Sequence, residues 1–300
     1  MKRYRLYQVD AFTTERFTGN PAGVVPNADG LSVDQMQRIA RELNNSETAF
    51  VLSPQASDHD VTVRFFTPTI EVPSCGHATI AAHHVRAIEN ALPSCTVTQK
   101  IGVGILPVDV IRDDSGYRIV MTQGPVEFGE PFAADRVGEI MDALGLTASQ
   151  LDDRCPVQVV STGHSKVLVG VRSQEVLDSL SPNLAGLAEL SGRIGCNGYF
   201  VFTLDPSSAE VFAHGRMFAP AIGIAEDPVT GNANGPLGAY VVEHGLVEPV
   251  AGSMSFRARQ GEALGRPGTV EVEVEVGGTA PMVVRVAGRA VVVFKTELEL

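Results

Sequence analysis

The sequence has no tryptophan, and only four cysteines and seven histidines among its 300 residues. The four cysteines lie far apart in the chain, at Cys75, Cys95, Cys155 and Cys196. They form no CxxC pair and no spacing typical of a zinc site, so we expect free thiols in a reducing cytoplasm. The histidines form no HxxxH or HExxH motif, and the adjacent His83 and His84 would point about 100° apart on a helix. We therefore expect a cytoplasmic protein with no disulfide framework and no bound metal.

Long apolar runs and nucleotide-binding motifs are also missing. No stretch approaches the roughly 18 apolar residues that a membrane helix needs, and residues 1–10 lack the apolar run of a secretory signal. There is no GxGxxG motif or P-loop, so we expect no nucleotide cofactor. Basic residues are few, since 23 Lys and Arg face 35 Asp and Glu, giving a net charge of −12. This charge argues against nucleic acid or an anionic membrane as the main partner, but it allows a local positive pocket for a small acid.

What the chain does contain is typical of a globular protein with an ample core. Apolar residues make up 44% of the sequence and charged residues 19%, which is close to the composition of ordinary globular proteins. The length exceeds that of one average domain, so we expect two domains or one large domain.

Periodic patterns predict secondary structure along most of the chain. Ser32 is placed to cap a helix that ends near Leu43, with Met36 and Ile39 on its apolar face. Further helices are predicted over residues 136–144 and 184–194. Strands are predicted over residues 4–12, 22–25, 49–52 (with 46–48 leading into it), 61–66, 96–99, 105–111, 117–123, 158–160, 166–171, 198–204, 210–218, 270–276, 282–287 and 290–294.

Residues 226–240 form the most unusual stretch. Two acids, Glu226 and Asp227, precede a turn, and small and apolar residues follow over 237–242. A helix that is apolar on nearly every side in a soluble protein is a core helix. Its N-terminus, at residues 230–232, would present free N–H groups and the positive end of the helix dipole, which suits an anion.

A second stretch, residues 71–82, repeats this layout. Like the first, it follows a Phe-x-Pro sequence and leads through an acid, a proline and a glycine turn into a small-residue helix, here predicted over 78–88. The glycine turns correspond, at residues 76–78 and 231–233. We therefore expect two halves of similar build, each with one buried helix that follows a glycine turn. The best candidate for the crossover between them is residues 123–125.

Several short motifs together point to a known family. They are Asp10-Ala11-Phe12, Gly19-Asn20-Pro21, Ser46-Glu47-Thr48, Phe66-Thr67-Pro68, Cys75-Gly76-His77-Ala78-Thr79, Arg216-Met217-Phe218-Ala219-Pro220, residues 226–239, and Gln260-Gly261 with Gly265-Arg266-Pro267. Over essentially the whole chain and in matching order, these motifs resemble those of the PhzF-like isomerases, which belong to the wider diaminopimelate-epimerase fold. Residues 226–240, 73–75 and 195–198 resemble in particular those of bacterial members known only as uncharacterised isomerases.

The resemblance implies an α+β fold with two similar domains, each a curved, mostly antiparallel sheet or barrel around a central helix. It implies an active site in the cleft between the domains. The first domain would comprise residues 1–122 plus 288–300 and the second residues 123–287, because the strand predicted over 290–294 would cross back to the first. It also implies a homodimer that uses no cofactor.

Three residues match the family's acid/base machinery. Glu47, next to Ser46, matches the glutamate that takes a proton from one carbon of a cyclic, unsaturated amino acid and returns one elsewhere on the same face. Asp227 would orient the substrate's amino group or assist proton transfer. His77, at a helix N-terminus that disfavours its cation, would act as a neutral donor or acceptor. From the residues alone, each also has a plain structural reading: a solvated acid before a strand, an acid beside a helix dipole, and a helix-start side chain bonded to backbone.

The remaining candidates would bind the substrate or line its site. The resemblance assigns Gly76 and the run Thr230-Gly231-Asn232-Ala233 to backbone N–H binding of the substrate carboxylate. Ser46 is a further substrate-binding candidate, and Asn20 and His164 are candidate lining residues. The phenazine-pathway enzyme has serine at the position of Asn232, and the bulkier amide here argues against the same substrate.

Cys75 is a departure from the phenazine-pathway enzyme, and we place it among the substrate-binding candidates. It falls where diaminopimelate epimerases keep one of two catalytic cysteines, and the helix end would favour its thiolate. Thr230 takes the place of the second cysteine, however, and threonine is no base near neutral pH. Small packing in a tight turn is the plain alternative for Cys75.

The sequence therefore predicts a cofactor-independent isomerase that moves a proton within a small carboxylate-bearing, amino-acid-like substrate, with Glu47 as general acid/base. Two alternatives stay open. One is an amino-acid racemase or epimerase that depends on Cys75, and the other is a small-acid-binding protein without turnover.

Overall fold

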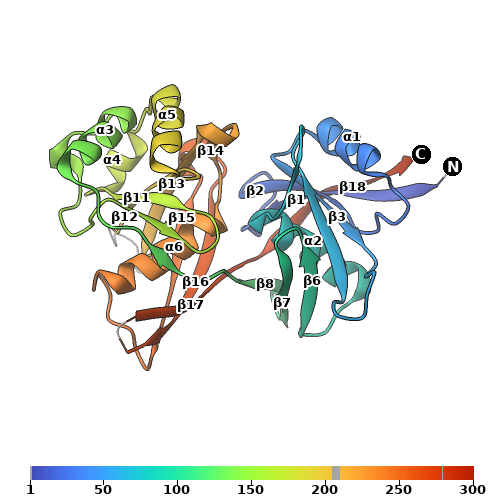
Figure 1. Cartoon of the computed structure of the whole chain (residues 1–300). Coiled ribbons are helices and arrows are strands. Elements are labelled where there is room, and N and C mark those ends of the chain that lie inside the picture. Colours follow the sequence, from blue (N-terminus) through green and yellow to red (C-terminus); the bar gives the residue numbers. More distant parts are fainter. Residues whose placement is uncertain (1, 205–209, 279) are drawn as a thin grey trace. The chain divides into compact units, whose positions relative to one another are not determined.

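The computed structural model describes residues 2–204, 210–278 and 280–300, and Figure 1 shows its helices and strands. The chain folds as two compact units, Met1–Thr122 with Ala287–Leu300 and Gln123–Val286. Each unit combines strands with helices, so the predicted α+β class is confirmed. Within the described ranges, no helix is both long and apolar enough to cross a membrane.

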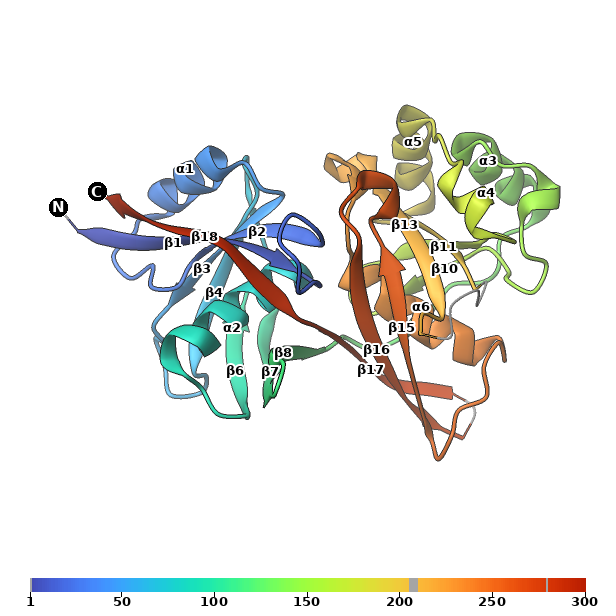
Figure 2. The same cartoon turned by 180° about the vertical axis from the view of Figure 1, so that it is seen from behind.

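The first unit is built on a mostly antiparallel sheet. Its strands are β1 (Arg3–Ala11), β2 (Asn20–Val25), β3 (Glu47–Leu52), β4 (Val61–Phe66), β5 (Glu71–Val72), β6 (Cys95–Ile101), β7 (Gly104–Asp113), β8 (Gly116–Thr122) and β18 (Ala290–Glu299). β1 pairs antiparallel with β2 and β18, whereas β2 with β3 and β4 with β6 are parallel. Figure 2 shows the two chain ends side by side on β1 and β18.

Helix α2 (Gly76–Asn90) is the central helix of the first unit. Ten of its 15 residues are buried, and most of those are small. Small side chains let the strands approach from several directions, and α2 packs against β1, β2, β3, β8 and β18. The prediction of a buried helix here is confirmed.

Helix α1 (Val33–Leu43) lies on the outside of the first unit. The Ser32 hydroxyl accepts a hydrogen bond from Gln35 N, and Gln35 bonds back to Ser32 N, which makes a complete capping box. Only one face is buried, through Met36, Ile39 and Ala40. The helix ends at Leu43, and its C-cap residue Asn44 has a φ of 53°, so the predicted start, end and apolar face are all confirmed.

The second unit has a mixed sheet with three outer helices on one face. Its strands are β9 (Glu127–Phe128), β10 (Gln158–Ser161), β11 (Lys166–Gly170), β12 (Tyr199–Thr203), β13 (Ala213–Ala219), β14 (Ile224–Asp227), β15 (Ser253–Gln260), β16 (Gly268–Gly277) and β17 (Ala280–Gly288). Its outer helices are α3 (Ala134–Leu144), α4 (Gln174–Asp178) and α5 (Leu184–Ile194), with 3-10 turns at Ala148–Gln150, Pro220–Ile222 and Glu262–Leu264. The outer helices share one apolar core with Val167 and Val169 of β11.

Helix α6 (Gly231–Glu243) packs on the opposite face of that sheet. Eleven of its 13 residues are buried, despite Pro236 in its interior. The Tyr240 ring meets Phe202 edge-on at 5.7 Å between ring centres, and its hydroxyl donates to Pro156 O at 2.8 Å. The core helix predicted from the run of small residues is thus confirmed.

Some predicted boundaries are wrong. Glu47 does not precede its strand, because Glu47 and Thr48 already pair with β2 and are the first residues of β3. Helix α2 starts two residues earlier than the predicted 78–88, directly after the N-cap residue Cys75. β14 and β15 were not predicted, since their patterns carry many polar and charged residues.

Candidate active site

The first unit brings a carboxylate and an imidazole together at the start of β3 and of α2. Glu47 opens β3 and pairs with Ala22 of β2, and His77 is the second residue of α2. His77 Nε2 lies 3.2 Å from Ser46 Oγ and 3.4 Å from Glu47 Oε2. The Glu47 and His77 side chains are 13% and 7% exposed. The three predicted residues Ser46, Glu47 and His77 are therefore neighbours in a largely dry place.

Glu47 Oε2 is the notable atom in this cluster. It is fully buried, and within the described part of the chain it accepts no hydrogen bond, although His77 Nε2 lies 3.4 Å away. A buried polar atom without a hydrogen bond is costly. The oxygen is therefore ready to accept a proton from a ligand.

Cys75 adds a thiol to the same cluster. Its Sγ lies 3.5 Å from His77 Nδ1 and 4.0 Å from Nε2. One ligand atom each from Glu47, Cys75 and His77 lie within 4.8 Å of one another. A thiol, an imidazole and a carboxylate are the donor types that zinc takes. The geometry of this group could hold a metal, a feature that sequence spacing did not reveal.

The start of α2 is open to a ligand. Cys75 is its N-cap with an extended backbone, and among the described residues no side chain caps the helix from that position. The first N–H groups of a helix have no intrahelical partners. Gly76 and His77 therefore present donors and the positive end of the dipole beside Glu47.

The second unit places Asp227 at the end of β14, just before α6. Asp227 pairs with Met217 of β13 and is 7% exposed. Thr230 is the N-cap of α6, yet its hydroxyl donates to Asp227 Oδ2 and does not cap the helix. The start of α6 is thus left open in the same way as that of α2.

Glu226, the other acid of this stretch, has a structural role. Both of its carboxylate oxygens accept from Arg216, at 2.9 and 2.8 Å. The same guanidinium donates to Leu177 O and Leu180 O, so it ties β14 and β13 to α4 and to the chain just after it. Both oxygens of Glu226 are therefore engaged by Arg216, and Asp227 is the acid that contacts the N-cap residue of α6.

Gln260, at the end of β15, fixes the turn between β14 and α6. Its Nε2 donates to Asp227 O at 2.8 Å and to Thr230 Oγ1 at 3.2 Å. Its Oε1 accepts from Thr230 N at 3.0 Å and from Asn234 Nδ2 at 3.1 Å. The sequence showed Gln260 only as part of a motif, and its position after an unpredicted strand concealed these contacts.

Gln123 holds the first turn of α6 from another direction. Its Nε2 donates to Asn232 Oδ1 at 3.0 Å and to Gly231 O at 3.4 Å, and its Oε1 accepts from Thr162 Oγ1 at 2.5 Å. A Cβ at Gly235 would lie 1.9 Å from Gln123 Oε1, so a larger residue there would displace the Gln123 amide from its present contacts. No sequence signal marked Gln123 as part of the site.

Backbone donors remain at the start of α6. Thr230 N is bound to Gln260, and the N–H groups of Ala233 and Asn234 bond to Thr230 O. Among the described contacts, the donors left over are therefore those of Gly231 and Asn232, the middle of the predicted carboxylate-binding run. Ala233 supports the turn through its own backbone bond.

The two predicted lining residues lie in different units. Asn20 is buried and opens β2, two residues before the Ala22 that pairs with Glu47. His164 lies in the loop between β10 and β11, where its Nδ1 is 3.4 Å from Asn197 Nδ2. Burial lowers the pKa of His164, and the positive charge of Lys166 lowers it further.

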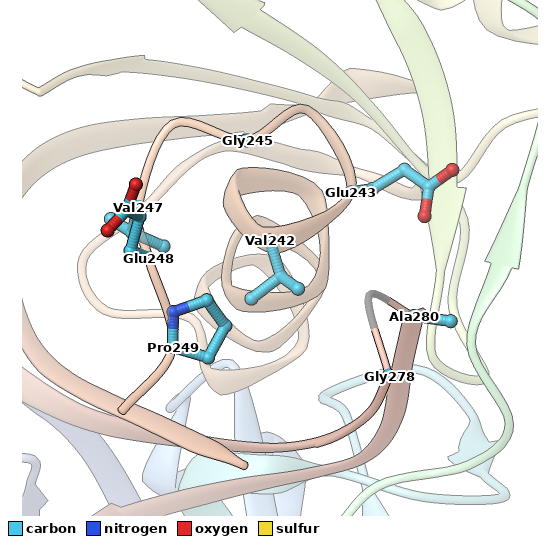
Figure 3. Close-up of a pocket in the computed structure, with 8 residues that line it drawn as sticks. All are labelled: Val242, Glu243, Gly245, Val247, Glu248, Pro249, Gly278 and Ala280. Atoms are coloured by element: carbon cyan, nitrogen blue, oxygen red, sulfur yellow. The ribbon is translucent and has the colours of Figure 1, made fainter. Parts of the chain in front are cut away.

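A cavity of about 520 Å³ lies elsewhere in the second unit, at the C-terminal end of α6 (Figure 3). Its lining comprises Val242, Glu243, Gly245, Val247, Glu248, Pro249, Gly278 and Ala280. None of these is a predicted site residue, and most are exposed. We therefore place the candidate chemistry at the helix starts and not in this cavity.

Comparison with known proteins supplies the context for these clusters. The family model described as phenazine biosynthesis-like protein matches residues 9–296. An uncharacterised isomerase of Clostridium acetobutylicum is 55% identical, over 100% of this chain and 99% of its own. The trans-2,3-dihydro-3-hydroxyanthranilate isomerase of Pseudomonas aeruginosa is 32% identical over 95% of both chains.

Solved structures agree with the family match. The phenazine biosynthesis protein of the PhzF family from Bacillus anthracis has a TM-score of 0.89 at 31% identity, with 100% of both chains covered. A hydroxyproline epimerase from Agrobacterium vitis has a TM-score of 0.67 at 16% identity, over 99% of this chain and 93% of its own, which shows a shared fold alone.

Proposed function

This chain is an isomerase of the phenazine biosynthesis-like protein family, and we propose that it moves a proton within a small carboxylate-bearing substrate without a cofactor. Glu47 is the general acid/base. The observation that carries the proposal is its buried Oε2, which lies 3.4 Å from His77 Nε2 beside the open start of α2.

In the proposed reaction, Glu47 takes a proton from a carbon of the substrate. The electron pair of that C–H bond moves into the neighbouring unsaturated system, and Glu47 returns the proton to another carbon of the same system. Atoms and electrons balance within the substrate, so the step needs no oxidant or reductant. A positioned acid/base of this kind contributes about 10²–10⁴-fold to the rate.

The neighbours of Glu47 would hold it in place for both transfers. His77 Nε2 forms a hydrogen bond with Ser46 Oγ at 3.2 Å, which holds the ring 3.4 Å from Glu47 Oε2. A neutral imidazole suits a helix N-terminus better than a cation does. Positioning of the base within hydrogen-bond reach of the carbon's proton is the first requirement of such catalysis.

The helix starts and Asp227 would bind the substrate. Backbone N–H groups at Gly76, Gly231 and Asn232 suit a carboxylate, and Asp227 suits an amino group. The Pseudomonas relative is named for an amino acid with a ring double bond, and we propose that this chain's substrate shares its carboxylate and unsaturation.

The test is exchange of substrate hydrogen in D2O, starting with trans-2,3-dihydro-3-hydroxyanthranilate and then a panel of small unsaturated amino acids. The wild type is expected to incorporate deuterium at carbon, and Glu47→Gln to lose at least about 100-fold of the rate. Glu42→Gln, an exposed glutamate on α1, is the matched control.

Full exchange in Glu47→Gln would refute the proposed base. Tight binding of an acid without exchange would point to a binding protein.

A second candidate function is a racemase or epimerase that depends on Cys75. It is favoured by the 3.5 Å separation of Cys75 Sγ and His77 Nδ1, which suits transfer of the thiol proton to the ring. Deuterium incorporation at the α-carbon of an amino acid, lost in Cys75→Ala but kept in Glu47→Gln, would establish it over the first.

A further inference from the structure

Lys166 is a buried charge of the second unit that the proposed reaction leaves unused. It is the first residue of β11 and is 4% exposed. Its ammonium donates one long hydrogen bond, 3.4 Å to Ser165 O, and within the described ranges it forms no ion pair. An ammonium has three donors, and a buried charge is stable only when paired and hydrogen-bonded. Lys166 therefore has room for an anionic partner.

The strand pattern directs Lys166 toward α6. Val167 and Val169 belong to the core under α3 and α5, and successive side chains of a strand point to opposite faces. Lys166 and Leu168 therefore lie on the face that α6 covers.

Contacts at both ends of α6 show which end lies near Lys166. At the C-terminal end, His244 Nε2 is 3.0 Å from Gln158 Oε1, and Gln158 pairs with Leu168. At the N-terminal end, Gln123 links Asn232 to Thr162, in the loop that leads into Lys166. The start of α6 and the start of β11 are thus held together.

The charges around Lys166 favour an added anion. Asp227, before α6, attracts the ammonium, the Cys196 thiol, before β12, lies close to it, and His164 is the titratable group of the adjoining loop. The start of α6 is positive as well. Burial lowers the pKa of Lys166 to about 8, so the group is mainly charged at neutral pH. One carboxylate, that of Asp227, thus faces two positive groups.

We infer that the Lys166 ammonium, together with the open N–H groups of α6, binds the carboxylate of the substrate. The inference rests on the proposed function, and it places the substrate carboxylate in the second unit, beside Lys166 and the start of α6. Glu226 does not compete for the ammonium, because Arg216 engages both of its oxygens.

The test measures binding of anthranilate and of anthranilamide, which differ only in the charged group, to the full chain by calorimetry at constant ionic strength. The variants are Lys166→Met and Lys166→Arg, with the exposed Lys295→Met as the matched control. In Lys166→Met, anthranilate is expected to bind about 10- to 100-fold more weakly, since a charge-assisted hydrogen bond is lost. Lys166→Arg should recover part of the loss, and anthranilamide should bind equally to all four proteins.

A pH series on the wild type gives a readout that needs no variant. Anthranilate affinity is expected to fall as the pH rises through about 8, where the ammonium loses its proton, and anthranilamide affinity to stay level. Equal anthranilate binding by the wild type and Lys166→Met, or no preference of the wild type for anthranilate over anthranilamide, would overturn the inference. Its failure is separable from that of the proposed function, because Glu47→Gln should abolish deuterium exchange while anthranilate binding persists.

Discussion

The hydroxyl of Thr230 donates to the carboxylate of Asp227 and accepts no hydrogen bond from the N–H groups of the helix that it caps. A threonine at an N-cap ordinarily accepts a hydrogen bond from the second or third N–H of its helix. Here the side chain orients an acid, and the helix donors stay available. The same arrangement recurs at α2, where Cys75 is the N-cap and its thiol lies against His77. The N-cap side chain of each helix thus contacts a neighbouring polar side chain and leaves the first N–H groups of the helix uncapped.

Replacement of Thr230 by valine tests the orienting role. Thr230→Val keeps the shape but removes the donor to Asp227, and a hydrogen bond to a charged group is worth about 1.5–3 kcal/mol. We expect kcat/KM to fall about 10- to 100-fold on a substrate found by the exchange screen, with Thr230→Ser close to wild type. The exposed Thr14→Val is the control. Unchanged kinetics in Thr230→Val would show that Asp227 needs no such hydrogen bond.

The buried hydrogen bonds of Gln260 are expected to stabilise the fold. Its amide makes four hydrogen bonds, two through Nε2 and two through Oε1, and the side chain is 1% exposed. Gln260→Leu would leave buried donors and acceptors unpaired, and we expect a loss of about 2–4 kcal/mol in the free energy of unfolding. Urea titration measures it, with the exposed Gln55→Leu as the control. A loss no larger than that of the control would mean that the turn before α6 is fixed by other contacts.

Two adjacent buried histidines of α2 are expected to make the free energy of unfolding depend on pH. Burial lowers the pKa of both His83 and His84 to about 4. Both pKa values rise to about 6.5 on unfolding, so between pH 6.5 and 4 the unfolded chain binds more protons. Stability from these groups is complete above pH 6.5 and is lost as the pH falls, by at most about 1.4 kcal/mol per pH unit for each histidine.

The measurement is the free energy of unfolding from urea titrations at pH 7.5, 6.0 and 5.0. His84→Gln should reduce the steepness of the decline below pH 6.5, because glutamine does not titrate. His83→Gln should do the same, although it also disturbs the 3.0 Å contact with Gln99 Oε1. An identical slope in both variants and the wild type would show that other groups govern acid unfolding.

Much of this fold was predictable because local patterns and tertiary packing agree. The boundaries of α5 and β4 match the predicted 184–194 and 61–66. The two central helices were predicted from their small, apolar residues, which only a buried helix tolerates on every side. β15 escaped prediction because serines and arginines occupy the outward positions of its alternating pattern.

The residue types of the candidate site could be predicted from the sequence. The hydrogen bonds that hold those residues in place could not. Glycine turns before apolar helices indicated where N–H groups would be open. The contacts of Gln123 with Asn232 and of Gln260 with Thr230 span 109 and 30 residues. No local pattern encodes such contacts, since they depend on which strand ends reach the helix. The neighbourhood of Glu47, Cys75 and His77 likewise arises only because β3 and α2 start at the same place.

That neighbourhood predicts a response to zinc. The thiol, imidazole and carboxylate that lie within 4.8 Å can bind Zn²⁺ after a small adjustment, since zinc takes such ligands at about 2.0–2.3 Å. Bound zinc would occupy Glu47, so we expect added Zn²⁺ to inhibit substrate exchange and EDTA to reverse the inhibition. Cys75→Ala should raise the half-inhibitory zinc concentration at least about 10-fold, as expected for loss of one ligand, while Cys95→Ala, outside the cluster, should not.

EDTA alone should leave the activity unchanged, because the proposed proton transfer uses no metal. Loss of activity on EDTA treatment, restored by zinc, would instead make the three residues a metal centre and would overturn the cofactor-free mechanism.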